Sequence, residues 1–379
     1  MAWRGYQPQI IPRALTPEEF ELLVRRHEAF VGGRRGGTRA IQRLIVARRL
    51  RCDRRNLSDA DFTGADLSAT TFIASRLQRT SLHCANLANT NFTGADLTRA
   101  DLRGANLAGA VLKDAVMDEA DLRAAVLVAA DDLVGLQWIG GAGSLAGARL
   151  ENAELSDVTA HSVDFSNATL RGARLRGANL KNANLSNANL ADADLQGARL
   201  EGAVLRGSIL TGIDIRALGL PPSRFKDCLL DPDETAVEAA EVLLQGARSM
   251  DLWARTGGRE GAPFALDGGD IRPLKGQLAG LSLPGLSARR ALAVGVSFRG
   301  AQLAGATFDG ADLRAADFNE ADLRGASFKG ANLAHASFAR SDVGSLRLVN
   351  GAVKLVELDG AVLSGTGLAS MVRARPADV

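Results

Sequence analysis

His83 and Cys84 are the one adjacent pair of a base and a thiol in this chain of 379 residues. An imidazole beside a thiol can activate the sulfur as a nucleophile. The pair follows Leu82 at positions that a repeat leaves outward, where any polar residue is tolerated, so we expect no catalysis there. No HExxH, GxSxG or Walker A motif occurs. The sequence therefore predicts no catalytic, cofactor-binding or metal-binding residue.

Cysteine usage and the N-terminus bear on the compartment. Cys52, Cys84 and Cys228 are odd in number and lack a CxxC spacing, so neither a disulfide framework nor a zinc site is supported. This usage favours a reducing compartment. The N-terminal residues lack an apolar signal region, and no window approaches about 18 uninterrupted apolar residues. We expect a cytoplasmic protein, although a non-cleaved secretion signal would escape this test.

Aspartates recur at one position, directly before a regularly spaced leucine or phenylalanine. Asparagine replaces them freely there, an exchange that a carboxylate mechanism or a metal site would not permit. We therefore interpret both residues as hydrogen-bonding partners of a turn. These residues are Asp61, Asp66, Asp96, Asp101, Asp194, Asp312 and Asp322, and Asn86, Asn106, Asn179, Asn184, Asn189 and Asn332.

The leucines themselves recur at every fifth position, most regularly from Leu170 to Leu205. We call this the core position, and the residue two places earlier, usually alanine, the small position. On an α-helix a step of five residues turns the side chain by about 140°, so no single apolar face forms. On a straight strand an odd spacing alternates the faces. A chain that turns a corner every five residues points each core residue inward, which predicts a solenoid with coils about 4.8 Å apart.

Three runs of this pattern occur, with core positions from Leu57 to Leu127, Leu145 to Ile215 and Leu278 to Leu368. In the third run, phenylalanine and leucine alternate, so that each type returns after ten residues. A four-sided coil of twenty residues would stack like on like, whereas a three-sided coil would mix the two types. We therefore expect four sides. The alternating phenylalanines are Phe298, Phe308, Phe318, Phe328 and Phe338.

The tandem A(D/N)LXX units at 92–107, FTGADLTRADLRGANL, and at 308–333, FDGADLRAADFNEADLRGASFKGANL, resemble the pentapeptide-repeat family. The resemblance implies an all-β solenoid, a right-handed quadrilateral β-helix with four pentapeptides per coil. It also implies a mostly non-enzymatic family of bacterial proteins. One branch resembles B-form DNA and protects DNA gyrase from inhibitors, and others are secreted effectors or regulatory partners.

Two helices are expected outside the repeats. Thr16, Pro17 and Glu19 form a capping-box arrangement for a helix that ends at Gly32, and that would cap the first coil. Asp231 with Glu234 repeats the arrangement within an insertion that looks like a second leader. The predicted segments are a basic leader at 1–54, repeats at 55–217 with a register break at 132–142, a helical insertion at 218–275, repeats at 276–370, and a tail at 371–379.

Nine arginines face a single acid, Asp53, between Arg34 and Arg55. One interpretation is a solvated helix or degenerate first coil, with inward apolar residues. The other is a phosphate-binding surface for nucleic acid or anionic lipid. Aromatic residues that could stack on bases are absent from this segment. The inward candidates are Ile41, Leu44, Ile45 and Leu50, and the candidate binding residues are Arg48, Arg49, Arg51, Arg54 and Arg55.

All three tryptophans fall outside the repeats. A corner sized for leucine or phenylalanine excludes the larger indole, which explains this placement by packing alone. Trp138 and Trp253 are alternatively exposed anchors for a protein partner.

The sequence favours a non-enzymatic scaffold or regulator that binds a protein partner through a rigid surface. A DNA mimic needs dense acid along the rod, whereas the repeat runs are close to neutral and the whole chain carries a net charge of +2. A gyrase-protecting mimic and a secreted effector are the alternatives. No cofactor is expected, and the oligomeric state is left open.

Overall fold

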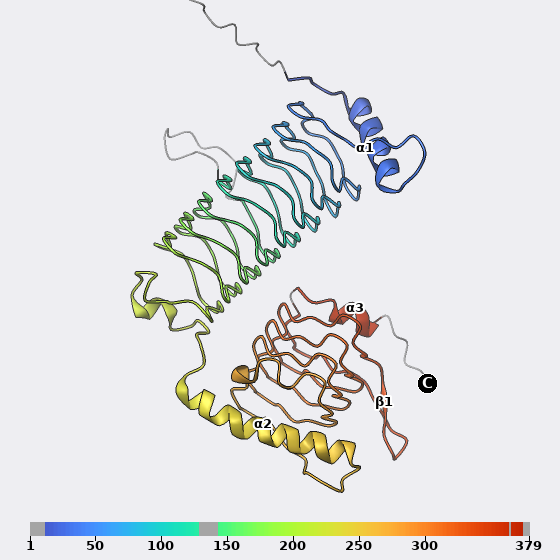
Figure 1. Ribbon diagram of the computed structural model, residues 1–379, viewed down its shortest axis with the longest axis vertical. Helices are drawn as coiled ribbons and strands as arrows, with labels where there is room; N and C mark the ends of the chain where they lie inside the picture. The colour runs from blue at the N-terminus through green and yellow to red at the C-terminus, as the bar shows by residue number, and fades with distance from the viewer. Residues whose placement is uncertain (1–11, 129–142, 364, 374–379) are drawn as a thin grey trace, which may run out of the picture. The chain divides into compact units, whose positions relative to one another are not determined.

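The computed structural model describes residues 12–128, 143–363 and 365–373, which form two compact units that divide between Leu230 and Asp231 (Figure 1). The predicted register break at 132–142 and residue Trp138 lie outside the described residues. The unit boundary falls inside the segment expected as a helical insertion.

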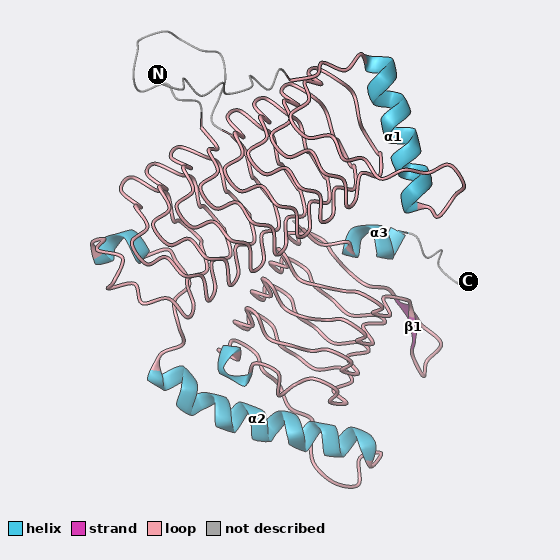
Figure 2. Ribbon diagram, turned by 45° about the horizontal axis from the view of Figure 1, so that its top comes forward, coloured by secondary structure: helices cyan, strands magenta, loops and turns pink. Residues whose placement is uncertain are grey.

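The first unit is a stack of coils joined by parallel bridges between residues twenty apart. Asp61, Ser81, Asp101 and Asp121 are bridged in succession on one side of the stack. The twenty-residue spacing confirms four pentapeptides per coil. Each coil also bonds the next, as when the Phe62 N–H donates to the Ser81 carbonyl over 2.8 Å. The pairing consists of isolated bridges instead of regular strands, because the chain turns after every bridge, and most of it is drawn as loop in Figure 2.

The pentapeptide around Leu82 shows why the pattern turns corners. Leu82 is fully buried, and the carbonyl of Leu82 accepts the Ala85 N–H at 3.0 Å to close a turn. Cys84 inside this turn has a φ of 52°, in the left-handed region. That conformation costs a residue with a side chain about 1–2 kcal/mol. It is held by the Cys84 N–H, which donates to the Arg103 carbonyl of the next coil at 2.8 Å.

Bridges cross the predicted register break without leaving the stack. Val111 pairs with Ser144, and Val126 pairs with Thr159, so thirteen additional residues separate partners that are otherwise twenty apart. The first and second repeat runs therefore form one continuous stack. Its last bridge joins Ile209 to Leu229.

The helix α1, Pro17–Val31, precedes the first coil. The Thr16 hydroxyl accepts the Glu19 N–H and the Glu19 carboxylate accepts the Thr16 N–H, which confirms the predicted capping box. Gly32 is the C-cap, as expected. Phe20, Val24 and His27 are the buried residues of α1.

The arginine-rich segment forms the first coil, with bridges from Ile41 to Asp61 and from Val46 to Asp66. The prediction that Ile41 and Leu44 point inward is wrong, because their side chains are 54% and 42% exposed. Pairing with the next coil sets the same five-residue pattern here, which assigns the inward positions to Ala40, Ile45, Ala47 and Cys52.

The second unit begins with α2, Glu234–Arg255, which buries Ala240, Leu244, Ala247 and Met250. Its N-cap is Asp233 and not the predicted Asp231, because the Asp233 carboxylate accepts the Ala236 N–H at 2.8 Å. A short 3₁₀ helix, η1, at Pro222–Phe225, lies in the first unit, and η2, Arg272–Leu274, lies in the second. Bridges of the second stack begin at Ala265.

Phenylalanine columns form the core of the second stack. Phe298 and Phe318, twenty residues apart, stack at 5.0 Å between ring centroids, and Phe308 and Phe328 stack at 5.3 Å. Phe298 meets Phe308 edge to face at 5.5 Å. These contacts confirm like-on-like stacking along facing walls, a favourable geometry for aromatic rings.

A hairpin interrupts the second stack. The strands β1, Leu346–Arg347, and β2, Val353–Lys354, pair antiparallel. Ser327 pairs with Glu357, thirty residues away, so the hairpin adds ten residues to one coil. Leu348 and Val353, which the five-residue pattern predicts as inward, lie in this hairpin and are 41% and 48% exposed. The short helix α3, Leu368–Arg373, follows the last coil.

Within the described residues, every helix is too short or too polar to cross a lipid bilayer.

Candidate functional site: the outward faces of the first stack

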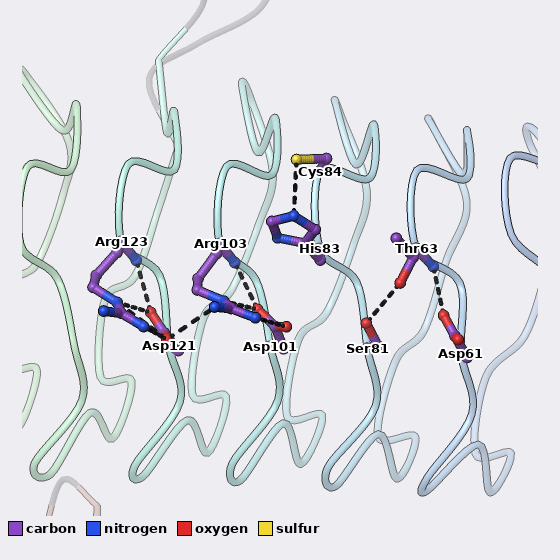
Figure 3. Close-up of polar contacts among 9 residues, drawn as sticks. All are labelled: Asp61, Thr63, Ser81, His83, Cys84, Asp101, Arg103, Asp121 and Arg123. Carbon is purple, nitrogen blue, oxygen red and sulfur yellow. Dashed lines mark hydrogen bonds and ion pairs between the residues drawn. The ribbon is translucent and has the colours of Figure 1, made fainter.

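One side of the first stack carries a row of polar contacts that runs from coil to coil, and we call it the Asp–Arg face (Figure 3). Its residues occupy equivalent outward positions in four successive coils, one place before or after a core residue, with Cys84 at the adjoining corner. The residues are Asp61, Thr63, Ser81, His83, Cys84, Asp101, Arg103, Asp121 and Arg123.

Arg103 and Arg123 each form an ion pair with the aspartate two residues earlier. Arg103 Nη2 lies 2.7 Å from Asp101 Oδ2, and Arg103 Nε lies 2.8 Å from Asp101 Oδ1. Side chains two residues apart on an extended segment share a side, so this sequence pattern forms a forked ion pair. The hydrogen bonds from Arg103 hold the pKa of Asp101 below its ordinary value. Arg103 also reaches Asp121 of the next coil at 3.6 Å, which links neighbouring coils.

The aspartate oxygens also bond the backbone. Asp101 Oδ1 accepts the Arg103 N–H at 3.2 Å, and Asp61 Oδ1 accepts the Thr63 N–H at 3.1 Å. Asn106 makes the same bond to the Ala108 N–H at 3.1 Å. The exchange of aspartate and asparagine at this position therefore has the predicted cause, a turn hydrogen bond that either side chain can accept.

The first two coils of the Asp–Arg face are joined by other polar contacts. Thr63 Oγ1 lies 2.8 Å from Ser81 Oγ, and Arg43 Nε donates to Asp61 Oδ2 at 2.7 Å. His83 and Cys84 follow, with His83 Nε2 at 3.5 Å from Cys84 Sγ. The pair is thus the point on this face where a nucleophilic atom is in contact with a base. Across the described residues, no group of three or more His, Cys, Asp or Glu side chains is placed to hold a metal ion.

Three of the candidate phosphate-binding arginines pair with carboxylates of the described residues. Arg48 pairs with Asp66 at 2.6 Å, and Arg51 pairs with Asp53 at 2.7 Å. Arg55 turns to α1, where it contacts Glu21 at 2.7 Å and Glu28 at 2.9 Å. Arg49 and Arg54 are exposed at corners of the first coil, with φ values of 57° and 58°. The structure therefore does not bring the five arginines into one site.

One of the two candidate tryptophan anchors, Trp253, lies in the described part of the chain. Trp253 lies in α2 and is half-buried. A side chain at Gly258 would come within 3.3 Å of its indole nitrogen, so the turn after α2 packs against the ring. Trp138 lies outside the described residues.

A second face was not recognised from the sequence, because it appears only when residues twenty apart are placed side by side. We call it the Ser/Thr/Asn face of the first stack. Ile73, Val111 and Val204 on it are 36%, 37% and 47% exposed, and Lys113, Asp164 and Arg206 are the charged members of the set. From the second coil onward, the set is Thr71, Ile73, Asn91, Thr93, Val111, Lys113, Ser144, Ala146, Asp164, Ser166, Asn184, Ser186, Val204 and Arg206. In the first coil, Arg51 and Asp53 hold the same positions and pair with each other at 2.7 Å.

Two repeat-family profiles match the chain. The family described as pentapeptide repeats (8 copies) matches residues 56–94, 95–131, 143–172 and 173–212, and pentapeptide repeats (9 copies) match residues 293–337. A search of curated proteins found no match.

Solved structures give more distant likenesses. QnrB1, a plasmid-mediated fluoroquinolone resistance protein, is 24% identical with a TM-score of 0.42, over 52% of this chain and 89% of that chain. HetL, a pentapeptide repeat protein involved in heterocyst differentiation regulation from the cyanobacterium Nostoc sp. strain PCC 7120, is 19% identical with a TM-score of 0.24, over 90% and 94%. The matched repeats, the twenty-residue coils and the buried core positions together show that the chain belongs to the pentapeptide-repeat family.

Proposed function

We propose that this protein is a non-enzymatic scaffold that binds a protein partner through the Ser/Thr/Asn face of the first stack. The observation that carries the proposal is the scarcity of charge on that face. The cores of protein interfaces are depleted of charged residues, because a buried charge must be desolvated. Asp164, one of its few charges, accepts hydrogen bonds from Asn184 Nδ2 at 3.0 Å and from the Ser166 N–H at 2.9 Å.

Rigidity supports the same proposal. Backbone N–H groups along this face bond the next coil, as from Phe92 to the Val111 carbonyl at 2.7 Å and from Leu112 to the Ser144 carbonyl at 2.7 Å. A surface that is already ordered loses little conformational entropy on binding. Its short side chains also have few rotamers to immobilise. A flat partner surface could therefore bind without a pocket.

The Asp–Arg face argues against mimicry of nucleic acid, the alternative function. Asp101 and Asp121 are each held in a fork by an arginine, which neutralises the charge that a DNA mimic must display. Arg48, Arg51 and Arg55 are likewise held by carboxylates, which weakens the case for a phosphate surface on the first coil. We also infer a right-handed coil from the family, and a cytoplasmic location from the sequence alone.

A matched pair of valines tests the proposal. Val111 lies on the Ser/Thr/Asn face, and Val116 holds the equivalent position on the adjacent face of the same coil. We expect Val111→Arg to weaken partner binding about tenfold or more, because the guanidinium must be desolvated at the interface. Val116→Arg should leave the affinity within about twofold. The partner is first isolated from the source organism with the full chain, and affinities are then measured with purified proteins.

Equal loss of binding in both variants, with unchanged circular dichroism, would place the partner elsewhere. Retention of binding by Val111→Arg would rule out this face. A complex that forms only at low salt and dissolves as salt rises would indicate a polyanion and contradict the scaffold.

A further inference from the structure

The three cysteines lie in different environments. Cys52 occupies a core position and is 2% exposed, and burial raises the pKa of its thiol to about 12. Cys228 is half-buried, and burial raises the pKa of its thiol as well. Cys84 is exposed at a corner of the Asp–Arg face. Of the three thiols, Cys84 is therefore the one that a reagent in solution reaches directly.

The corner conformation brings a base to this thiol. The Cys84 side chain lies beside that of His83, whose Nε2 is 3.5 Å from Sγ (Figure 3). His83 Nδ1 is buried and has no hydrogen-bond partner among the described residues. Of the two ring nitrogens, Nε2 is therefore the one engaged in a polar contact, and that contact is with the sulfur.

The next coil leaves open space beside the sulfur. The Cys84 N–H donates to the Arg103 carbonyl at 2.8 Å, which fixes the position of this corner against the next coil. The Asp101 carboxylate is already engaged by Arg103. Gly104 carries no side chain, and a Cβ there would lie only 3.2 Å from Cys84 Sγ. A glycine at this position thus leaves one side of the sulfur open.

We propose that Cys84 is a site of thiol–disulfide exchange with a low-molecular-weight disulfide, and that His83 is the base that activates it. The Cys84 proton moves to His83 Nε2, in the tautomer that carries its own proton on Nδ1. The thiolate then attacks one sulfur of the disulfide. A new S–S bond forms to Cys84, the original S–S bond breaks, and the released thiolate takes up a proton. The electrons balance because the incoming disulfide is the oxidant.

Glutathione disulfide is the probe for the test, with intact full-length protein and mass spectrometry over time between pH 6 and pH 9. We expect one thiol to gain a glutathionyl group rapidly, and Cys84→Ser to abolish that reaction. His83→Ala should slow it about tenfold near pH 7, because the thiol loses its base. The two rates should approach each other as the pH rises, because hydroxide then removes the proton in place of the imidazole.

His161 provides the matched control. It holds the same place in its pentapeptide as His83, one residue after a core position, but it lies on a different face of the stack and serine follows it in place of cysteine. His161→Ala should react at the wild-type rate, and circular dichroism should show all variants folded. An unchanged rate in His83→Ala would overturn the proposal. So would a Cys84 rate no higher than that of the same protein unfolded in urea, where the fold no longer holds His83 Nε2 against the thiol. Because the assay contains no protein partner, its outcome is independent of the scaffold proposal.

Discussion

Arg55 occupies a small position of the repeat, where most other coils have alanine, serine or threonine. It lies at the edge of the stack under α1, with its side chain 22% exposed. Its guanidinium forms a fork with Glu28, at 3.0 and 2.9 Å, and a third contact with Glu21 at 2.7 Å. Glu28 also accepts the Asn56 N–H at 3.1 Å. A long basic residue fits here because a helix and not another coil covers this corner.

This cluster makes stability depend on pH. The hydrogen bonds from Arg55 lower the pKa of Glu28 below its ordinary value of 4.5, so the cluster stabilises the fold above that pH and loses its effect as the pH falls through the lower folded-state value. We expect Arg55→Met to destabilise the first unit by about 1–2 kcal/mol at pH 7. The difference from wild type should shrink below about pH 4 in denaturant titrations.

Arg54→Met is the control for this prediction, since Arg54 is the exposed neighbour. It should change the unfolding free energy by less than about 0.5 kcal/mol. A difference between Arg55→Met and wild type that is the same at pH 3 and pH 7 would show that the ion pairs contribute nothing.

At the scale of elements, residues 13–31 cover the open edge of the first coil. The Leu15 N–H donates to the Val46 carbonyl and the Val46 N–H donates to the Arg13 carbonyl, both at 2.9 Å. His27 of α1 accepts the Ala40 N–H at 3.0 Å and contacts the Ser58 carbonyl at 2.9 Å. Such backbone groups, if uncovered, can pair with another chain. We propose that α1 and the residues before it act as the cap of the stack.

Deletion of residues 1–38 tests the cap. The shortened chain should form dimers or larger species in light scattering, and its melting temperature should fall, because the edge groups of the first coil lose their partners. Deletion of residues 1–11 is the control, since it removes none of these bonds. If the chain without residues 1–38 stays monomeric and has the same melting temperature as the full chain, the cap assignment is wrong.

At the scale of the whole molecule, each unit has a hydrophobic core of its own. The core of the first unit extends from Phe20 to Phe225, and that of the second from Ala240 to Leu368. In a stack, each coil contacts mainly its neighbours, so stability is nearly a sum of local contributions. Two separate cores therefore predict two cooperative transitions.

Two phenylalanines, one from each core, test this independence. Phe72 stacks on Phe92 at 5.1 Å in the first unit, and Phe318 stacks on Phe338 at 5.2 Å in the second. Each substitution to alanine should leave a cavity and cost about 3–5 kcal/mol. In calorimetry, Phe72→Ala should lower the temperature of one transition, and Phe318→Ala should lower the temperature of the other. Gln302→Ala, at an exposed position, should shift neither.

If calorimetry shows a single transition and both phenylalanine variants lower its temperature equally, the two cores unfold together. That result would contradict independent units and leave the coil architecture unaffected.

The sequence by itself determined the coil. A core residue every fifth position, a small residue two places earlier and a turn between them are local requirements, so they are visible along the chain. The capping box at Thr16 is equally local, because both of its hydrogen bonds join Thr16 and Glu19. The phenylalanines that recur every ten residues also indicated four sides, because residues of one type then stack twenty positions apart in successive coils.

Only the tertiary structure decided which side chains lie together on each face of the stack. The ten-residue hairpin is a whole number of repeats, so it left the spacing intact while it moved Leu348 and Val353 out of the core. Ile41 and Leu44 are apolar, yet pairing with the next coil turned them outward. The Ser/Thr/Asn face and the surroundings of Cys84 join residues from successive coils. The five-residue pattern is the same on all four sides of a coil, so it does not show which outward side chains lie together. Only the stacking of coils determines which side chains become neighbours.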